Sequence, residues 1–480
     1  MPRFKSLICI NKDPLSKTLS LVNIHCTVLV FVIKLLAGLK NIIDLYPILS
    51  EIISTKLGIL IFTKIVETTG LLNEAGLELN TLAAKCQSLK NNRVVLNVDG
   101  PILFFKKATL ESGKSYQEMY DNIMDDEDFI QMQNSNIDDV TNNFKQEIYN
   151  IIRNFCYYNL KFDCIRIYFD GKSPEAKQYT KTMRRKKQSD NYRRNLILSN
   201  IKTIIERLKE SEWVTIDVPV EIVNLEKGEA EMEMIRGRNP DDINIFYTVD
   251  SDVFLIGYGL ANCFVYSNRK QEIYDLAMLK RRLQFPTFVF RLMFVFAGSD
   301  YVKNLFSANM TIYFLTFLMK IFQSNKKHHA FKGNQENLNK FKKEQLPVFK
   351  KYFECDNRPI TKDDVVNFIK DLFYTVGKYK YVYKLELDIP RSKTCPLESS
   401  EEDYENFMYQ IIWHMNYLEY GSDYENYNKQ FIYVETIDKL NFIFKLIKPS
   451  FQLEDKDNLV NFIDKLYTKT FERSLITEKW

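Results

Sequence analysis

The sequence predicts an α/β fold: a mostly parallel, twisted sheet flanked by helices, followed by a mainly helical C-terminal region. Three short runs rich in β-branched and aromatic residues indicate strands at 93–98, 164–169 and 243–249. Segments with helical spacing separate these runs, and such alternation is typical of parallel strands joined by crossover helices. Beyond residue 330 the apolar residues recur mostly at helical spacing.

The remaining elements follow from the same patterns. Further strands are expected at 214–218 and 263–267, and helices at 38–86, 144–158, 229–235 and from Pro174 onward. Ser173 is the expected N-cap of the helix that begins with Pro174. The very apolar segment 288–296 ends in Ala-Gly-Ser-Asp.

A chain of 480 residues is long enough for one large core and one or two smaller domains. We expect an N-terminal extension at 1–36, a main α/β domain at 37–325 and a helical region at 326–480. Within the main domain, 106–142 is interpreted as a polar surface insertion with some helix, and 172–212 as basic helices.

The apolar stretch 21–39 is interrupted by His25 and Lys34. A charged lysine is costly in lipid, so the pattern favours an ordinary buried helix over a signal anchor. We therefore expect no membrane attachment.

The composition limits which metal ligands and which charged surfaces the chain can have. A net charge of +4 excludes a uniformly basic protein, although a local basic patch remains open. The eight cysteines are scattered and form no C-x-x-C pair, which argues against structural zinc and for a reducing, intracellular setting. With only four histidines, a metal site would depend on carboxylates, the ligands preferred by Mg²⁺ and Mn²⁺.

Acidic residues follow the predicted strands. Asp99, Asp170 and the pair Asp250/Asp252 stand at strand carboxyl ends, which meet at one edge of a parallel sheet. One aspartate of this kind is usually only a turn residue. Here the pattern recurs, and three further acids complete a set of seven: Glu229, Glu231 and Asp300.

Seven carboxylates in one place would repel one another strongly unless cations were bound among them. Two divalent ions about 4 Å apart can activate a water and stabilise the leaving oxygen of a phosphodiester. The acidic set therefore predicts a site for two Mg²⁺ ions, for which Mn²⁺ can substitute.

A basic run begins soon after Asp170. Seven cations fall within sixteen positions, and two more extend the run: Lys172, Lys177, Lys181, Arg184, Arg185, Lys186, Lys187, Arg193 and Arg194. A solvated basic helix face is one interpretation. Its position beside a candidate metal ligand favours a surface that steers phosphates.

The ordered acidic motifs resemble those of the flap endonuclease (XPG-type) 5′ nuclease family, over roughly residues 37–305. The matching stretches are Asp99-Gly100, Asp170-Gly171-Lys172-Ser173-Pro174, Gly228-Glu229-Ala230-Glu231, Asp250-Ser251-Asp252 and Gly298-Ser299-Asp300-Tyr301. The resemblance implies a PIN-like fold, a helical arch formed by the basic helices of 172–212, and catalytic roles for Lys177 and Arg184. It also implies base stacking by Phe105.

Several functions stay open at this stage. The resemblance implies cleavage of DNA with a 5′ flap or free 5′ end, in replication, repair or recombination, together with proteins of those processes. A sister family, the 5′-to-3′ exoribonucleases, shares the acidic core, so RNA is an alternative substrate. A non-catalytic junction-binding protein is a second alternative. The chain lacks the glycine-rich helix-turn-helix signature after Asp300 that the family uses with K⁺ to grip duplex. The nucleus is the expected location, or the site of viral DNA replication if the source is viral.

Overall fold

A computed structural model describes much of the chain between residues 65 and 447. All the described residues belong to one of the chain's two compact units, Gly58–Trp480. They are 65–66, 69–72, 75–88, 92–103, 126–177, 192–213, 216–248, 250–267, 272–323, 335–381, 399–429, 432–434 and 437–447.

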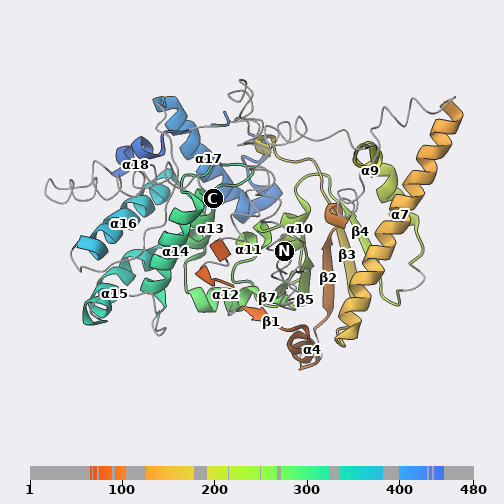
Figure 1. Cartoon of the computed structure of the whole chain (residues 1–480), viewed down its shortest axis with the longest axis horizontal. Coiled ribbons are helices and arrows are strands. Elements are labelled where there is room, and N and C mark those ends of the chain that lie inside the picture. Colours follow the sequence, from red (N-terminus) through yellow and green to blue (C-terminus); the bar gives the residue numbers. More distant parts are fainter. Residues whose placement is uncertain are drawn as a thin grey trace, which may run out of the picture. The chain divides into compact units, whose positions relative to one another are not determined.

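A mixed sheet of seven strands organises the described part of the chain, in the order β1-β7-β6-β5-β2-β3-β4 (Figure 1). The five strands from β6 to β4 in this order are parallel, and β7 and β1 add an antiparallel edge. This confirms the predicted α/β class with a mostly parallel sheet. The strands are β1 (Gly76–Leu77), β2 (Val94–Asp99), β3 (Cys164–Phe169), β4 (Val220–Asn224), β5 (Ile243–Tyr247), β6 (Cys263–Ser267) and β7 (Glu272–Asp275).

Helices cover both faces of the sheet, which explains why its central strands are almost wholly apolar. Every residue of β2 and β5 is buried. Side chains alternate between the faces, so Ile245 and Tyr247 enter one core and Phe246 enters the other. The run 164–169 is the predicted strand to the residue.

Residues 216–218 of the predicted strand at 214–218 are not part of a strand, and 214–215 lie outside the described residues. Ile216 N–H donates to the carbonyl of Trp213, and ladder pairing starts at Val220 opposite Ile165. Residues of β4 are only half-buried or exposed, as expected for the last strand of a sheet. Because β4 is an edge strand with few buried apolar residues, its strand pattern is weaker than that of the Val-Thr-Ile-Asp-Val run before it.

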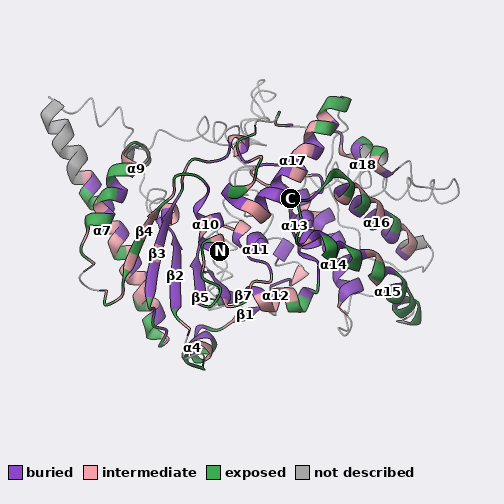
Figure 2. Ribbon diagram, turned by 180° about the vertical axis from the view of Figure 1, so that it is seen from behind, coloured by how far each residue is buried: buried purple, intermediate pink, exposed green. Residues whose placement is uncertain are grey.

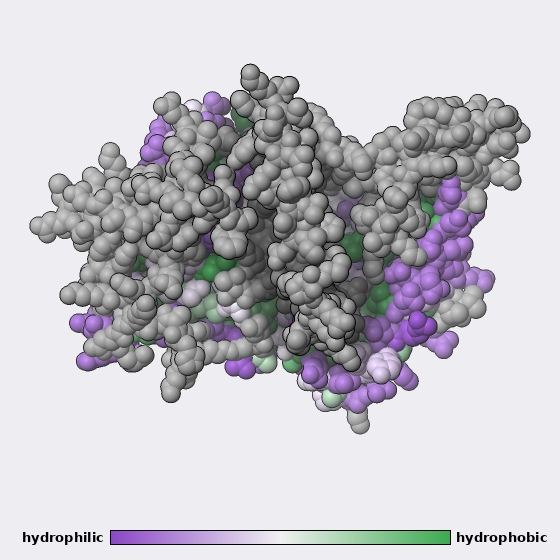
Figure 3. Space-filling model, viewed as in Figure 1, coloured by the Kyte–Doolittle hydropathy of each residue, from purple (hydrophilic) through white to green (hydrophobic). Residues whose placement is uncertain are grey.

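Two long helices, α7 (Asp126–Tyr157) and α9 (Tyr192–Glu210), pack together on one face of the sheet. Apolar residues of α7 recur every three or four positions and are buried: Ile137, Val140, Phe144, Ile148, Ile151 and Phe155. The surface over the outer side of α7 is hydrophilic (Figure 3). The predicted helix at 144–158 thus extends back to 126, into the expected polar insertion; 106–125 lies outside the described residues.

α4 (Leu79–Ser88) also lies against this core. The helical pattern predicted over 38–86 is interrupted by β1, and its part before residue 65 lies outside the described residues.

The other face carries most of the remaining helices, and their burial is shown in Figure 2. One hydrophobic core contains residues beneath the sheet and residues of the C-terminal helices. These helices confirm the predicted helical character of the C-terminal region. The elements are α10 (Ala230–Arg236), α11 (Asp252–Ile256), α12 (Leu276–Leu283), α13 (Thr287–Ala297), α14 (Ala308–Phe322), α15 (Gln335–Lys350), α16 (Lys362–Tyr381), α17 (Glu401–Tyr420), α18 (Lys439–Ile447) and the 3-10 turns η1 (Glu175–Lys177), η2 (Lys351–Cys355) and η3 (Gly421–Asp423).

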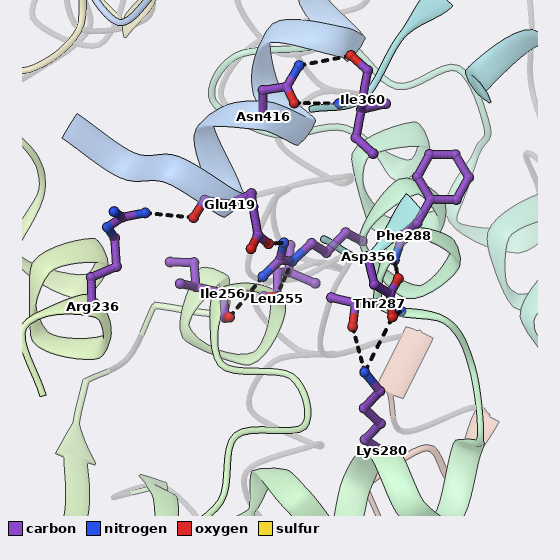
Figure 4. Close-up of polar contacts among 11 residues, drawn as sticks. Arg236, Leu255, Ile256, Lys280, Thr287, Phe288, Asp356, Ile360, Asn416 and Glu419 are labelled. Atoms are coloured by element: carbon purple, nitrogen blue, oxygen red, sulfur yellow. Dashed lines mark hydrogen bonds and ion pairs between the residues drawn. The ribbon is translucent and has the colours of Figure 1, made fainter. Parts of the chain in front are cut away.

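Buried polar contacts fasten α17 to the sheet-covering helices (Figure 4). Arg291 of α13 donates to the carbonyls of Leu255 and Ile256 at 2.8 and 3.0 Å, and forms an ion pair with Glu419. Arg236 donates to the carbonyl of the same Glu419 at 2.6 Å. Glu419 of α17 thus links α10 to α13, and Arg291 joins α13 to α11.

No helix in the described ranges is long and apolar enough to cross a membrane. The apolar stretch 21–39 lies outside those ranges, so its predicted nature stays a prediction.

Asp356 offers a direct test of how α13 is fixed. Its carboxylate accepts from the N–H groups of Thr287 and Phe288 at 3.0 and 2.9 Å, and caps the start of that helix. We expect Asp356→Ala to lower the free energy of unfolding by about 2 kcal/mol, as losing a helix cap does. Urea denaturation measures this, with exposed Glu354→Ala as the control, and equal stability of the two variants would contradict the capping role.

Candidate active site

Three strand ends bring distant acidic residues together. Asp99 is the last residue of β2, Asp170 directly follows β3, and Asp250 lies three residues beyond β5. β2 pairs in parallel with both β3 and β5, with Val95 opposite Cys164 and Asn244. The three carboxyl ends therefore meet at one edge of the sheet, as the sequence predicted.

The loop before α10 is joined to the loop after β3. Gly171 N–H donates to the carbonyl of Gly228 at 3.0 Å, and Gly228 N–H donates to the carbonyl of Lys172 at 3.1 Å. A side chain at 171 would place its Cβ 2.4 Å from the backbone nitrogen of Lys227, so only glycine allows this approach. Asp170 then accepts from the N–H of Ala230 at 2.9 Å, at the start of α10. The pairing places Asp170 beside the acids that flank Ala230.

The loop that carries Asp300 is held from the C-terminal helix α17. The Ser299 hydroxyl accepts from the N–H groups of Tyr301 and Val302 at 3.1 and 3.2 Å, and lies 3.0 Å from Nδ1 of His414. Because two N–H groups already point at the oxygen, the hydroxyl proton goes to Nδ1. Burial lowers the pKa of His414 to about 3, which keeps the ring a neutral acceptor.

Mutual repulsion is visible in the pKa values of the cluster. Burial, and then the charge of Asp170, raises the pKa of Asp99 well above its usual value. Burial, followed by Glu229 and Asp250, does the same for Glu231. The neighbouring carboxylates thus lie close enough to disfavour the charged forms of Asp99 and Glu231.

The pKa values of Asp250 and Asp252 are raised as well. Burial is again the largest cause of their raised pKa values, and the negative charge of Asp300 adds to it in both. The acids differ in access to solvent: Asp99 and the two glutamates are buried, the pair after β5 and Asp300 are half-buried, and Asp170 is exposed. The cluster is therefore open on the side of Asp170.

Lys177 lies inside the cluster. It forms an ion pair with Glu229, and its Nζ is 3.6 Å from Asp300 Oδ2. Burial alone would lower the pKa of Lys177, but the carboxylates around it raise it well above the usual value. One ammonium cannot neutralise seven carboxylates, so the cluster retains a large negative charge.

The donor chemistry fits hard divalent cations, which take oxygen ligands and often keep several waters. As the side chains stand, no three acidic, histidine or cysteine residues of the described part are arranged to chelate an ion. Internal donors hold them instead: Thr248 donates to Asp99 at 3.0 Å, and Asp252 N–H donates to Asp250 at 3.0 Å. Filling the site would require Lys177 to withdraw from Glu229.

Two tyrosines with no role expected from the sequence complete the surroundings of Glu229. Its Oε2 accepts from the hydroxyl of Tyr301, next to Asp300, and from that of Tyr417 on α17 at 3.2 Å. A third, Tyr427, donates to the carbonyl of Lys172 at 2.6 Å. The resemblance included Tyr301 in its motif, but only the fold shows that α17 reaches the acids.

Much of the predicted basic run lies outside the described residues. Lys172 is exposed and lies 3.9 Å from Glu175, a loose surface pair. The helix expected from Pro174 begins as the 3-10 turn η1; the rest of it, to 191, lies outside the described residues, and so does Phe105. The roles of the following residues stay predictions, the last two lying in α9 with undescribed side chains: Lys181, Arg184, Arg185, Lys186, Lys187, Arg193 and Arg194.

Comparison with solved structures finds nucleases. A bacteriophage T5 flap endonuclease in complex with DNA and metal ions is 10% identical in sequence, with a TM-score of 0.31. The alignment covers 60% of this chain and 94% of the endonuclease chain. The catalytic core of Rad2 in complex with a DNA substrate is 15% identical, covers 82% and 93%, and has a TM-score of 0.33. The T5 5′-exonuclease with bound zinc is 13% identical, with coverages of 59% and 93% and a TM-score of 0.28. No protein-family model and no curated protein matches the sequence.

Removing one charge from the cluster should stabilise the metal-free protein. We expect Glu231→Gln to raise the free energy of unfolding by about 1 kcal/mol at pH 7.5 in EDTA, or roughly 1–3 °C in a chain of this size. The reason is that the native state disfavours the charged form of Glu231.

The pH dependence has a defined sign. Between the unfolded pKa near 4.5 and the higher folded value, native Glu231 keeps a proton that the unfolded chain releases. Wild-type stability should thus rise as the pH falls through this window, and the advantage of the variant should shrink. Thermal melts from pH 7.5 to 5 measure it, with exposed Glu226→Gln as the control. A destabilised Glu231→Gln protein in EDTA would argue against repulsion.

Proposed function

We propose that this protein is a divalent-metal-dependent phosphodiesterase that cuts nucleic acid at or near a 5′ end. The observation that carries the proposal is the convergence of seven carboxylates and Lys177 at one edge of a parallel sheet. Burial and neighbouring negative charge raise the pKa values of Asp99, Glu231 and Asp252 there, and the surrounding carboxylates raise the pKa of Lys177. Such a concentration of charge costs stability, and its chemical use is to hold cations.

The electrostatic couplings suggest how the acids would share two ions. After burial, the charge of Asp170 raises the pKa of Asp99 and that of Asp300 raises the pKa of Asp252, while the charge of Asp250 contributes to both shifts. We infer that Asp250 lies between the two ions. When bound, Mg²⁺ or Mn²⁺ supplies an activated water and charge stabilisation of the leaving oxygen.

Lys177 has a second use once cations neutralise the cluster. Its ammonium is already buried among the acids beside Glu229 and lies 3.6 Å from Asp300. Released from these partners, it would donate to a non-bridging oxygen of the scissile phosphate and stabilise the charge that develops there. Arg184 and the basic run after it are proposed to steer the phosphate backbone.

DNA with a 5′ flap or free 5′ end is the proposed substrate, because the ordered acidic motifs resemble those of flap endonucleases. We place its activity inside the cell, in DNA replication, repair or recombination. DNA and RNA both carry backbone phosphates, so contacts to phosphate do not distinguish them. Competition between matched 5′-phosphorylated DNA and RNA tests which polymer is the substrate. Preferential cleavage of RNA would replace this substrate with that of an exoribonuclease.

The catalytic site is tested by Asp250→Ala. We expect cleavage of a 5′-labelled flap DNA with Mg²⁺ to fall at least about 100-fold, because the variant loses the ligand shared by both ions. EDTA should abolish wild-type cleavage. Binding of the same DNA, measured in Ca²⁺, should change less than cleavage.

Asp241→Asn is the matched control, because Asp241 is exposed and precedes the opposite end of the same strand β5. It should cut at the wild-type rate. Equal cleavage by Asp250→Ala and the control would remove the acids from catalysis, and binding without cleavage by the wild type would favour a junction-binding protein.

A further inference from the structure

The carboxylate of Glu229 is held on both oxygens. Lys177 lies against Oε1, whereas Oε2 accepts from the hydroxyls of Tyr301 and Tyr417, the latter at 3.2 Å. A carboxylate oxygen has two lone pairs in its plane, and two phenols occupy those of Oε2. Oε1 is therefore the oxygen that faces the Lys177 ammonium.

Tyr417 comes from the part of the chain in which the sequence shows no motif. It is 188 residues from Glu229 and 1% exposed. Its ring stacks on that of Trp413, with 5.0 Å between the ring centroids. The centroids of the Tyr301 and Tyr427 rings lie 5.4 and 6.0 Å away. Packing on three aromatic neighbours fixes the direction in which the hydroxyl points.

The segment 413–427 is also fastened to the chain just before Glu229. Tyr427 accepts from the N–H of Gly228 at 3.0 Å, and Lys227 donates to the carbonyl of Ser422 at 3.1 Å. Both contacts are within two residues of Glu229, so a shift of this segment would move the acid itself.

Contacts after Glu229 complete the attachment. Ser422 donates to the carboxylate of Glu233 at 2.9 Å, and Arg236 donates to the carbonyl of Glu419 at 2.6 Å. A Cβ on Gly421 would lie 2.8 Å from Met232 and Arg236, so η3 lies directly on α10. The C-terminal helix thus holds α10 along its length.

We propose that Tyr417 is a positioning residue for Glu229, and that the C-terminal helical region is thereby part of the metal centre. The phenol fixes Oε2 and leaves Oε1 directed at the place of the Lys177 ammonium. A divalent cation entering there meets a carboxylate already oriented for it. This inference rests on the proposed function for its biological meaning, but its physical content is metal affinity.

The test is Tyr417→Phe, which removes one hydroxyl and keeps the packed ring. Titration calorimetry with Mn²⁺ should show about tenfold weaker binding, as losing a partner that orients a metal ligand does. The Mg²⁺ concentration for half-maximal cleavage should rise by a similar factor. DNA binding in EDTA should not change.

Tyr420→Phe is the matched control. Tyr420 lies one turn further on the same helix, and its ring stacks on that of Tyr424 with 6.3 Å between the ring centroids. Its Mn²⁺ affinity should equal that of the wild type. In a Glu229→Gln background, Tyr417→Phe should have no further effect on Mn²⁺ binding, because it acts through that carboxylate.

The outcomes separate the two proposals. Equal Mn²⁺ affinity of Tyr417→Phe and Tyr420→Phe, with or without a lower melting temperature, would overturn the positioning role. An equal loss of affinity in the Glu229→Gln background would overturn it as well. Mn²⁺ binding by a wild-type protein that cuts no nucleic acid would instead refute the proposed function, while the calorimetric comparison would still decide the role of Tyr417.

Discussion

Electrostatic repulsion among carboxylates is the constraint on which the rest of this structure depends. Burial and neighbouring negative charge raise the pKa values of Asp99, Glu231 and Asp252, so the native state is held together against this cluster. Internal donors reduce the cost: Lys177 against Glu229, backbone N–H groups and tyrosine hydroxyls. Neutral or singly charged donors offset this repulsion less than a doubly charged ion would.

The parallel sheet and the C-terminal helices meet this constraint in different ways. The sheet gathers strand ends that are far apart in sequence, and the register of β2 with β3 and β5 fixes their separation. The helices supply the second layer around the acids, through His414 on the Asp300 loop and Tyr417 on Glu229. Their hydrophobic core is continuous with the core beneath the sheet, which makes the helical region a support of the site.

Local patterns predicted the sheet well where strands are buried. β3 and β6 lie where their apolar runs stand, and the acids at the strand ends meet as parallel topology requires. β4 was misplaced because an edge strand is only half apolar, and β7 is too short to give a pattern. The phenols around Glu229 could not be predicted, since the contact with Tyr417 spans 188 residues and depends on how α17 packs. Nothing in the spacing of α17 distinguishes a tyrosine that touches an acid from one that only fills the core.

The most direct measurement is anomalous diffraction from crystals soaked in Mn²⁺, which locates the ions without reference to any activity. We predict two manganese peaks about 4 Å apart, within coordination distance of Asp250 and of acids from both sides of the cluster. We also expect the Lys177 ammonium to have moved away from Glu229. Soaked crystals with no manganese among the seven carboxylates, and with the Lys177–Glu229 ion pair intact, would contradict both expectations.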